Sequence, residues 1–288
     1  PLPNSVLHKI KEQLNLEWTY NSNSIEGNTL NLRETQLILE EGITVGGKSL
    51  REHFEVVNHE KAIDYLYSLV NTDYTLRSID ILNLHSYILK NIEDEYAGRL
   101  RNGGVRIVGA NFTPPSAKKV PDLIDELVVF VNENPLSAND LVLATLFHHK
   151  LVWIHPFFDG NGRTVRLAMN LLLMRKGFPP AIILKNDRKK YYDALNQANN
   201  GNYQKLCLLM LQATERSLNM YISAMPGNSY DDYEPISSIV AEPNFPYGQE
   251  YISLLARQGK IDAYKEGKNW LTTRDAIEEY VVNRKRKR

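Results

Sequence analysis

Helical periodicity dominates the first 224 residues of this chain and limits the folds that it can adopt. Apolar residues recur there at the three- and four-residue spacing of amphipathic helices, and glycines or prolines separate the successive segments. The sequence therefore predicts a mainly α fold. The expected helices cover 5–20, 33–42, 50–70, 78–91, 121–133, 139–154, 163–176, 188–200 and 203–224.

One stretch among these helices has a different pattern. The segment "RNGGVRIVGANFTPP" (101–115) holds a short run rich in β-branched residues between glycines and a double proline. Such a run favours a strand over a helix. We expect a small β-hairpin or flap here, with Val105, Arg106, Ile107 and Val108 as its extended part.

Composition places the chain among ordinary globular proteins. It is 43% hydrophobic and 24% charged, and its formal net charge is zero, so no bulk field favours nucleic acid or a membrane surface. No uncharged apolar run approaches the ~18 residues of a membrane span, and no secretory leader pattern opens the sequence. Its one cysteine, Cys207, excludes an internal disulfide. We expect a cytoplasmic location and no membrane contact.

The composition changes in 226–248, where prolines and glycines interrupt any long helix. We therefore expect one large domain at 1–225, a linker at 226–235 and a small module at 236–288.

The segment "HPFFDGNGRTVR" (155–166) places polar and flexible residues between two apolar helices. Pro156 ends the first helix, because a proline pushes the residue before it out of helical geometry. A second helix begins near Gly162, so the glycine-bearing loop lies at a helix N-terminus. Unpaired N–H groups and the positive end of the helix dipole favour an anion there, and glycines let phosphate oxygens approach closely.

The charged residues of this segment fit a nucleotide with a metal ion. Arg163 and Arg166 share one helical face near that N-terminus, and guanidinium groups bind phosphate bidentately. Asp159 suits Mg²⁺, which favours one or two carboxylates together with phosphate oxygens. His155 has the chemistry of a general base for a hydroxyl. A tight turn and a core histidine would explain each residue alone, but not the combination.

At these residues the chain resembles the Fic family, whose signature HPFx[DE]GNGRxxR it matches throughout. The resemblance covers about 20–225, including "AGRLR", the double proline and "RKKYYDALNQANNGN". Fic enzymes transfer a nucleotide monophosphate to a protein hydroxyl. The resemblance therefore implies a Fic-type helical bundle that moves AMP from ATP to Ser, Thr or Tyr of a target protein.

The resemblance also implies a role for each residue of the site. His155 would deprotonate the target hydroxyl, and Asp159 would hold Mg²⁺ against the phosphates of ATP. Tyr191 and Asn199 would contact the adenine ring, and the flap at 105–108 would dock the target backbone by strand addition. The implied phosphate ligands are Gly160, Asn161, Gly162, Arg163 and Arg166, the last of them at the γ-phosphate.

Gly162 bears on the type of reaction. Kinase-like members of the superfamily carry a lysine at this position, whereas glycine leaves the anion cradle open, so AMP transfer is favoured over phosphotransfer. An alternative from another class is a DNA-binding regulator whose Fic core senses a nucleotide without transferring it. The intact His155 and the complete loop favour the enzyme. ATP and other nucleotides both stay open as substrates.

The stretch "SNSIEGN" (22–28) has the composition of a polar turn or a helix cap. It also matches the family's inhibitory motif [ST]xxxE[GN] at Ser22, Glu26 and Gly27. The resemblance implies an N-terminal inhibitory helix whose Glu26 pairs with Arg166 and keeps that arginine from the γ-phosphate. In some relatives the equivalent glutamate also positions a water that removes the AMP group, and the sequence leaves that role open.

The stretch at 251–281 resembles the second half of an excisionase-like winged helix-turn-helix, with a helix, a two-stranded wing and a closing helix. Such modules often bind DNA through a basic face. Residues 227–288, however, hold ten basic and ten acidic residues. We therefore favour protein docking or support of a homodimer over DNA binding for this module.

Overall fold

The computed structural model describes residues 4–71, 75–107, 112–224, 233–241, 245–266 and 268–285. The chain divides into two compact units, Pro1–Tyr221 and Ile222–Arg288. No helix within the described ranges is both long and apolar enough to cross a bilayer.

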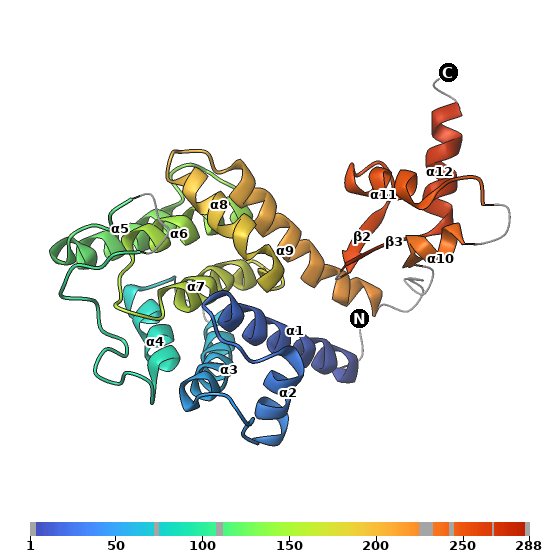
Figure 1. The fold of residues 1–288 in the computed structure, drawn as a ribbon. Coiled ribbons are helices and arrows are strands. Elements are labelled where there is room, and N and C mark those ends of the chain that lie inside the picture. Colours follow the sequence, from blue (N-terminus) through green and yellow to red (C-terminus); the bar gives the residue numbers. More distant parts are fainter. Residues whose placement is uncertain are drawn as a thin grey trace. The chain divides into compact units, whose positions relative to one another are not determined.

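The first unit is mainly helical, as predicted, and its helices follow the expected ranges closely (Figure 1). Short 3₁₀ turns at Ala117–Lys119 (η1) and Lys185–Asp187 (η2) precede two of the helices. The helices are α1 (Asn4–Ile25), α2 (Leu32–Glu41), α3 (Leu50–Val70), α4 (Ser78–Leu89), α5 (Val120–Glu133), α6 (Asp140–Ile154), α7 (Asn161–Arg175), α8 (Arg188–Ala198) and α9 (Gln204–Ser223).

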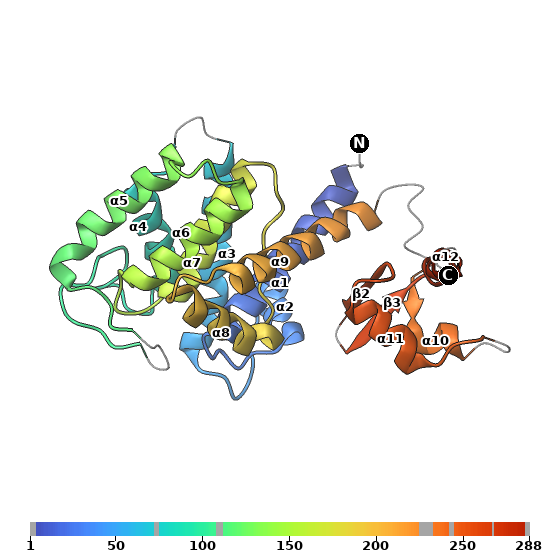
Figure 2. The ribbon, with the colours of Figure 1, turned by 90° about the horizontal axis from the view of Figure 1, so that it is seen from above.

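Helix α7 lies inside the first unit and packs against α6, α3, α4 and α1 (Figures 1 and 2). Its residues are buried on all sides from Asn161 to Leu173, with few exceptions. A helix that is buried all round is held by its neighbours rather than by one apolar stripe. The polar first turn of α7 is therefore enclosed by other helices, and their side chains decide what it contacts.

Helix α1 is longer than the apolar periodicity predicts, because it continues through Ser22 to Ile25. Asn21 and Asn23 donate their side-chain amides to backbone oxygens one turn earlier in α1, at 2.8 and 3.0 Å. The polar turn or cap expected from composition is therefore the last turn of a packed helix. The chain turns away at Gly27, whose φ of 104° lies in the region that glycine alone adopts without strain.

The flap predicted at 101–115 contains no strand in its described part. Residues 105–107 have no regular secondary structure, and Val108 lies outside the described residues. The expectation of a hairpin is therefore wrong for 105–107. Their β-branched composition favours extended backbone, but a strand also needs a partner with which to exchange backbone hydrogen bonds.

The second unit contains a helix, a two-stranded hairpin and a closing helix, in the order predicted for 251–281. They are α11 (Gln249–Arg257), the hairpin of β2 (Ala263–Glu266) with β3 (Asn269–Thr272), and α12 (Arg274–Lys285). It also has β1 (Glu234–Pro235) and α10 (Ile236–Val240). The sheet is antiparallel with the order β1-β3-β2, and Pro235 lies opposite Leu271. The linker predicted at 226–235 therefore ends earlier, since its last two residues pair with the sheet.

Candidate active site at the start of helix α7

His155 closes helix α6 in a left-handed backbone conformation, with φ 50° and ψ 63°. Its N–H still bonds to the carbonyl of Leu151 at 3.1 Å, so the chain turns sharply at the end of the helix. Burial lowers the pKa of His155 to about 4. The imidazole is therefore neutral near pH 7 and has a lone pair with which to accept a proton, as a general base must.

The loop that follows delivers the backbone N–H groups of α7 to one place. The first helical hydrogen bond runs from Thr164 N–H to Gly160 O at 3.0 Å, so the N–H groups of 161–163 precede the helical ladder. Gly160 has φ 71°, and a Cβ on it would lie 3.1 Å from Ile88 and 3.3 Å from His85. A side chain at this position would be strained by the left-handed backbone and crowded by these two neighbours, so glycine suits the turn that leads into α7.

The side chain of Asn161 bonds within the loop in this structure. Its Oδ1 accepts the N–H of Phe157 at 3.0 Å, and its Nδ2 donates to the carbonyl of Phe157 at 2.9 Å. The amide thus bonds within the loop on both sides and is nearly buried. In this arrangement the side chain braces the loop, and what Asn161 offers an anion is its backbone N–H.

Replacement of Asn161 by alanine should destabilise the first unit. The two backbone groups of Phe157 would lose their partners, and one unsatisfied buried polar group costs about 1–3 kcal/mol. We expect the free energy of unfolding, measured by urea with circular dichroism, to fall by about 2 kcal/mol or more. Asn200→Ala is the control, since that side chain is exposed. Equal stability of the two variants would contradict the bracing role.

Arg166 is 2% exposed and points back toward helix α1. One terminal nitrogen pairs with Glu26 Oε1 at 2.7 Å and donates to the carbonyl of Ser22 at 2.8 Å, while Nε donates to Ser22 Oγ at 3.1 Å. The ion pair between Glu26 and Arg166 is therefore confirmed. Within the described residues, the other terminal nitrogen of Arg166 has no hydrogen-bond partner, so a buried donor remains for an anion.

The carboxylate of Glu26 occupies the space directly in front of Gly162. A Cβ built on Gly162 would lie 2.0 Å from Oε1 and 2.7 Å from Cδ of Glu26. No larger residue fits at 162 while Glu26 holds this position. Gly162 thus leaves the helix N-terminus open to an anion, and in this structure the anion is the carboxylate of Glu26.

Arg163 is also buried, and helix α3 supplies its counter-charge. It pairs with Glu55 Oε1 at 3.2 Å and lies 3.7 Å from Asp159 Oδ2. Asp159, whose side chain is 38% exposed, also pairs with Arg51. Sequence reasoning missed Arg51 and Glu55. Their one signal was an opposite-charge pair four residues apart on a predicted helix, which is typical of many solvated helices.

His85 on helix α4 supports the loop, although no sequence motif indicated this residue. Its Nδ1 accepts the N–H of Gly98 at 3.0 Å, so its Nε2 carries the proton and donates to the carbonyl of Asp159 at 3.0 Å. Its ring stacks on Phe157 with 3.6 Å between centroids. Burial lowers the pKa of His85 to about 4, which keeps this single tautomer near pH 7.

In this structure the two residues implied as adenine contacts hold α8 against α6. Tyr191 is 2% exposed, and its hydroxyl bonds to His148 Nε2 at 2.8 Å. Asn199 Oδ1 accepts from His149 Nε2 at 2.8 Å. The neighbouring Tyr192 is 36% exposed, and burial together with the charge of Glu26 raises its pKa. Tyr192 is therefore partly exposed and close enough to Glu26 for that charge to act on its hydroxyl.

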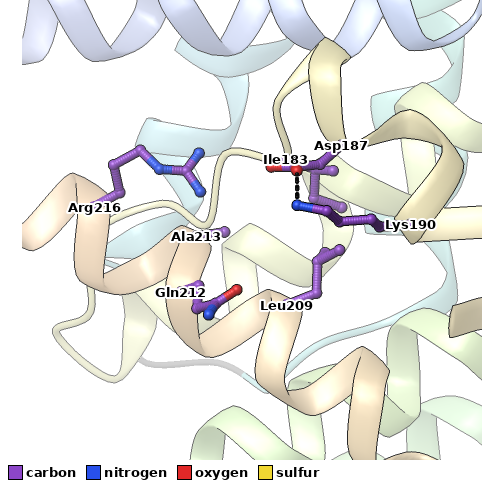
Figure 3. Close-up of a pocket in the computed structure, with 7 residues that line it drawn as sticks. All are labelled: Ile183, Asp187, Lys190, Leu209, Gln212, Ala213 and Arg216. Carbon is purple, nitrogen blue, oxygen red and sulfur yellow. Dashed lines mark hydrogen bonds and ion pairs between the residues drawn. The ribbon is translucent and has the colours of Figure 1, made fainter. Parts of the chain in front are cut away.

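A separate small pocket lies between η2, α8 and α9 (Figure 3). Its volume is about 50 Å³, which suits water rather than a nucleotide. Asp187 and Lys190 pair with each other on one side of it at 2.9 Å. This pocket therefore does not compete with the start of α7 as the site of nucleotide chemistry.

Comparison with known proteins matches residues 75–173 to the Fic/DOC family. Protein adenylyltransferase fic-1 of Caenorhabditis elegans is 38% identical over 228 residues, which cover 78% of this chain and 44% of that protein. Protein adenylyltransferase Fic of Aedes aegypti is 34% identical over 266 residues, covering 92% of this chain and 52% of the relative. The chain thus spans about half the length of these curated relatives.

Two solved structures extend this similarity to the fold. A fragment of Fic-1 from C. elegans has a TM-score of 0.70 and 37% identity, and the match covers 78% of this chain and 67% of the fragment. A signaling protein with a Fic domain from Bacteroides thetaiotaomicron has a TM-score of 0.72 and 28% identity, over 80% of this chain and 93% of the other.

Proposed function

This chain belongs to the Fic/DOC family, and on that premise we propose that it is a protein adenylyltransferase. It moves AMP from ATP to a serine, threonine or tyrosine hydroxyl of a target protein. One observation carries this proposal: a neutral His155 precedes a glycine-bearing loop that leads into the N-terminus of α7, where Gly162 has no side chain to obstruct an anion. The curated relatives of that name support the same reaction.

The geometry provides for each part of the transfer. The neutral imidazole of His155 takes the proton of the target hydroxyl, and the hydroxyl oxygen attacks the α-phosphorus of ATP. A phosphodiester forms, the bond to the β-phosphate breaks, and pyrophosphate leaves. The N–H groups at the start of α7 and the free terminal nitrogen of Arg166 stabilise the negative charge of the phosphates.

Asp159 fits the Mg²⁺ that accompanies ATP. It offers a partly exposed carboxylate two residues before the first residue of α7, and Mg²⁺ in proteins is commonly bound by one or two carboxylates with phosphate oxygens. The ion would neutralise phosphate charge and orient the leaving group. Arg51 and Arg163 balance the charge of this carboxylate in the present structure.

The contacts of Glu26 support an autoinhibited state. Its carboxylate pairs with the arginine that would bind the γ-phosphate and fills the space in front of Gly162. ATP phosphates that enter this space meet a negative charge and lose the contact with Arg166. The α-phosphate is then displaced from His155, and a displacement of ~1 Å costs about a hundredfold in rate.

Intact mass spectrometry of the Glu26→Gly protein with ATP and Mg²⁺ tests the proposed reaction. We expect the protein to gain the mass of AMP by self-modification. A gain of one phosphate would indicate phosphotransfer instead. An unchanged mass with every nucleotide tested would favour a nucleotide-sensing regulator over an enzyme.

The pH dependence of the Glu26→Gly protein should reflect the lowered pKa of His155. The charged groups that act on this imidazole are Arg101, Glu26 and Asp159, and burial has the largest effect. Because its pKa is about 4, the base form predominates at pH 6 and above. An imidazole with the usual pKa of about 6.5 would be about three-quarters protonated at pH 6.

We therefore expect transfer rates at about pH 6 and about pH 7.5 to agree within about twofold and to fall only as the pH approaches 4. Initial rates with labelled ATP check this, with circular dichroism as the control for folding. A loss of most activity between about pH 7.5 and pH 6 would contradict a neutral, buried base.

A further inference from the structure

Arg101 joins the catalytic turn to both ends of the segment predicted as a flap. Its side chain is 2% exposed. Nε donates to the carbonyl of His155 at 2.7 Å, and one terminal nitrogen donates to the carbonyl of Gly103 at 2.9 Å. The other terminal nitrogen donates to the carbonyls of Pro115 at 2.6 Å and Ile154 at 3.3 Å. One guanidinium thus binds four carbonyls from three parts of the chain.

The backbone of Arg101 adds to this connection, because its N–H donates to the carbonyl of Pro156 at 2.9 Å. Ile154, His155 and Pro156 are therefore all held by one residue. The middle one, His155, has the left-handed backbone conformation that sets the direction of its imidazole. A non-glycine residue keeps such a conformation only where its surroundings impose it.

Helix α6 explains how the charge of Arg101 is balanced. Within the described residues Arg101 forms no ion pair with a carboxylate. The carbonyls of Ile154 and His155, however, belong to the C-terminal end of α6, where the helix dipole is negative and the last carbonyls lack helical partners. Arg101 thus serves as a side-chain cap for α6.

We propose that Arg101 is a positioning residue that couples target docking to catalysis, because it holds the turn at His155 and both anchors of the 103–115 segment through one guanidinium. This inference rests on the proposed function. Gly103 and Pro115 flank the segment to which the family resemblance assigns target docking, and Arg101 fixes both of them against the turn at His155. Loss of the guanidinium should therefore impair transfer to the hydroxyl and leave ATP binding intact, since in the described part of the chain the hydrogen bonds of Arg101 go to Gly103, Pro115 and residues 154–156 and not to the first turn of α7.

Two substitutions of Arg101 in the Glu26→Gly protein separate geometry from charge. Arg101→Lys keeps the positive charge but cannot bind four carbonyls, and Arg101→Gln removes the charge as well. We expect the rate of AMP transfer to fall about tenfold to a hundredfold in both variants, because a small displacement of the reacting groups lowers the rate strongly. ATP affinity, measured by calorimetry, should stay within about twofold.

The pH profile distinguishes positioning from a general loss of stability. Arg101 is one of the charges that lower the pKa of His155, beside burial. The acidic limb of the profile should therefore move to higher pH in Arg101→Gln and stay in place in Arg101→Lys. Arg175→Lys is the matched control. Arg175 is the last residue of α7, and it also donates to a carbonyl, that of the buried Leu69. The control should keep the rate and the profile of the parent.

Tryptic cleavage after Arg106, which is exposed, gives a readout that needs no enzymatic activity. Release of Gly103 and Pro115 should speed this cleavage at least about threefold in both Arg101 variants, as local opening becomes easier. If the Glu26→Gly parent fails to transfer AMP, the proposed function fails, and this cleavage still tests the coupling. Parent-like rates of transfer and of cleavage in the Arg101 variants would overturn the inference.

Discussion

Replacement of Glu26 by glycine should raise the rate of self-modification by about a hundredfold. The substitution removes the carboxylate that pairs with Arg166 at 2.7 Å. The same carboxylate fills the space in front of Gly162, where its oxygen lies 2.0 Å from the point that a Cβ would occupy. Both the arginine and the helix N-terminus then become available to the phosphates. Incorporation of label from ATP carrying the isotope at the α-phosphate measures the rate directly.

Two further variants make this result specific. Glu26→Gln keeps the size of the side chain and removes its charge, so we expect a rate between those of the parent and of Glu26→Gly. Glu12→Gly places a glycine on the exposed face of α1, where Glu12 pairs with His8, and should leave the rate near that of the parent. A rate for Glu26→Gly no higher than for Glu12→Gly would remove Glu26 as the inhibitory group.

Removal of the base should have the opposite effect. In the Glu26→Gly protein, substitution of His155 should lower the transfer rate by about a hundredfold to ten-thousandfold, the usual contribution of a positioned general base. Asparagine is the better replacement, because it tolerates the left-handed backbone of this position (φ 50°), whereas alanine adds strain there. His155→Asn therefore isolates the chemistry of the imidazole from the shape of the turn.

Binding and folding controls accompany the His155 variant. ATP affinity should be retained, since the N–H groups of α7 and Arg166 are unchanged. His8→Ala removes an exposed imidazole, with 71% of its side chain accessible, and should transfer AMP at the parental rate. Labelling of the His155→Asn protein at the parental rate would mean that another group takes the proton.

Much of the fold could be predicted because helices depend on near neighbours in the sequence. Apolar spacing placed every helix of the first unit, and Pro156 with Gly160 placed the loop between α6 and α7. The end of α1 was less predictable. The last turn of α1 is polar by composition. It remains helical because side chains such as Asn23 donate hydrogen bonds to backbone carbonyls of α1 and of α3.

The chemical types at the active site were also predictable, whereas their partners were not. His155, Asp159 and Arg166 followed from one segment of twelve residues, and the pairing of Arg166 with Glu26 followed from a motif 140 residues earlier. Asn161 shows the limit of this reasoning. The resemblance implied that Asn161 contacts phosphate, and no local pattern indicated that its side chain also closes the loop on Phe157, four residues before it.

Local sequence thus determined which groups are present and where the chain turns, because capping, helical periodicity and glycine geometry act over a few residues. Tertiary packing alone decided which groups meet. Helices α3 and α4 bring Glu55 to Arg163 and His85 to the carbonyl of Asp159, and Arg101 reaches the turn at His155 from 54 residues away. Buried charges and carbonyls are stable only when they are paired or hydrogen-bonded. Their partners come from segments that are distant in the sequence, so no local spacing predicts which groups pair.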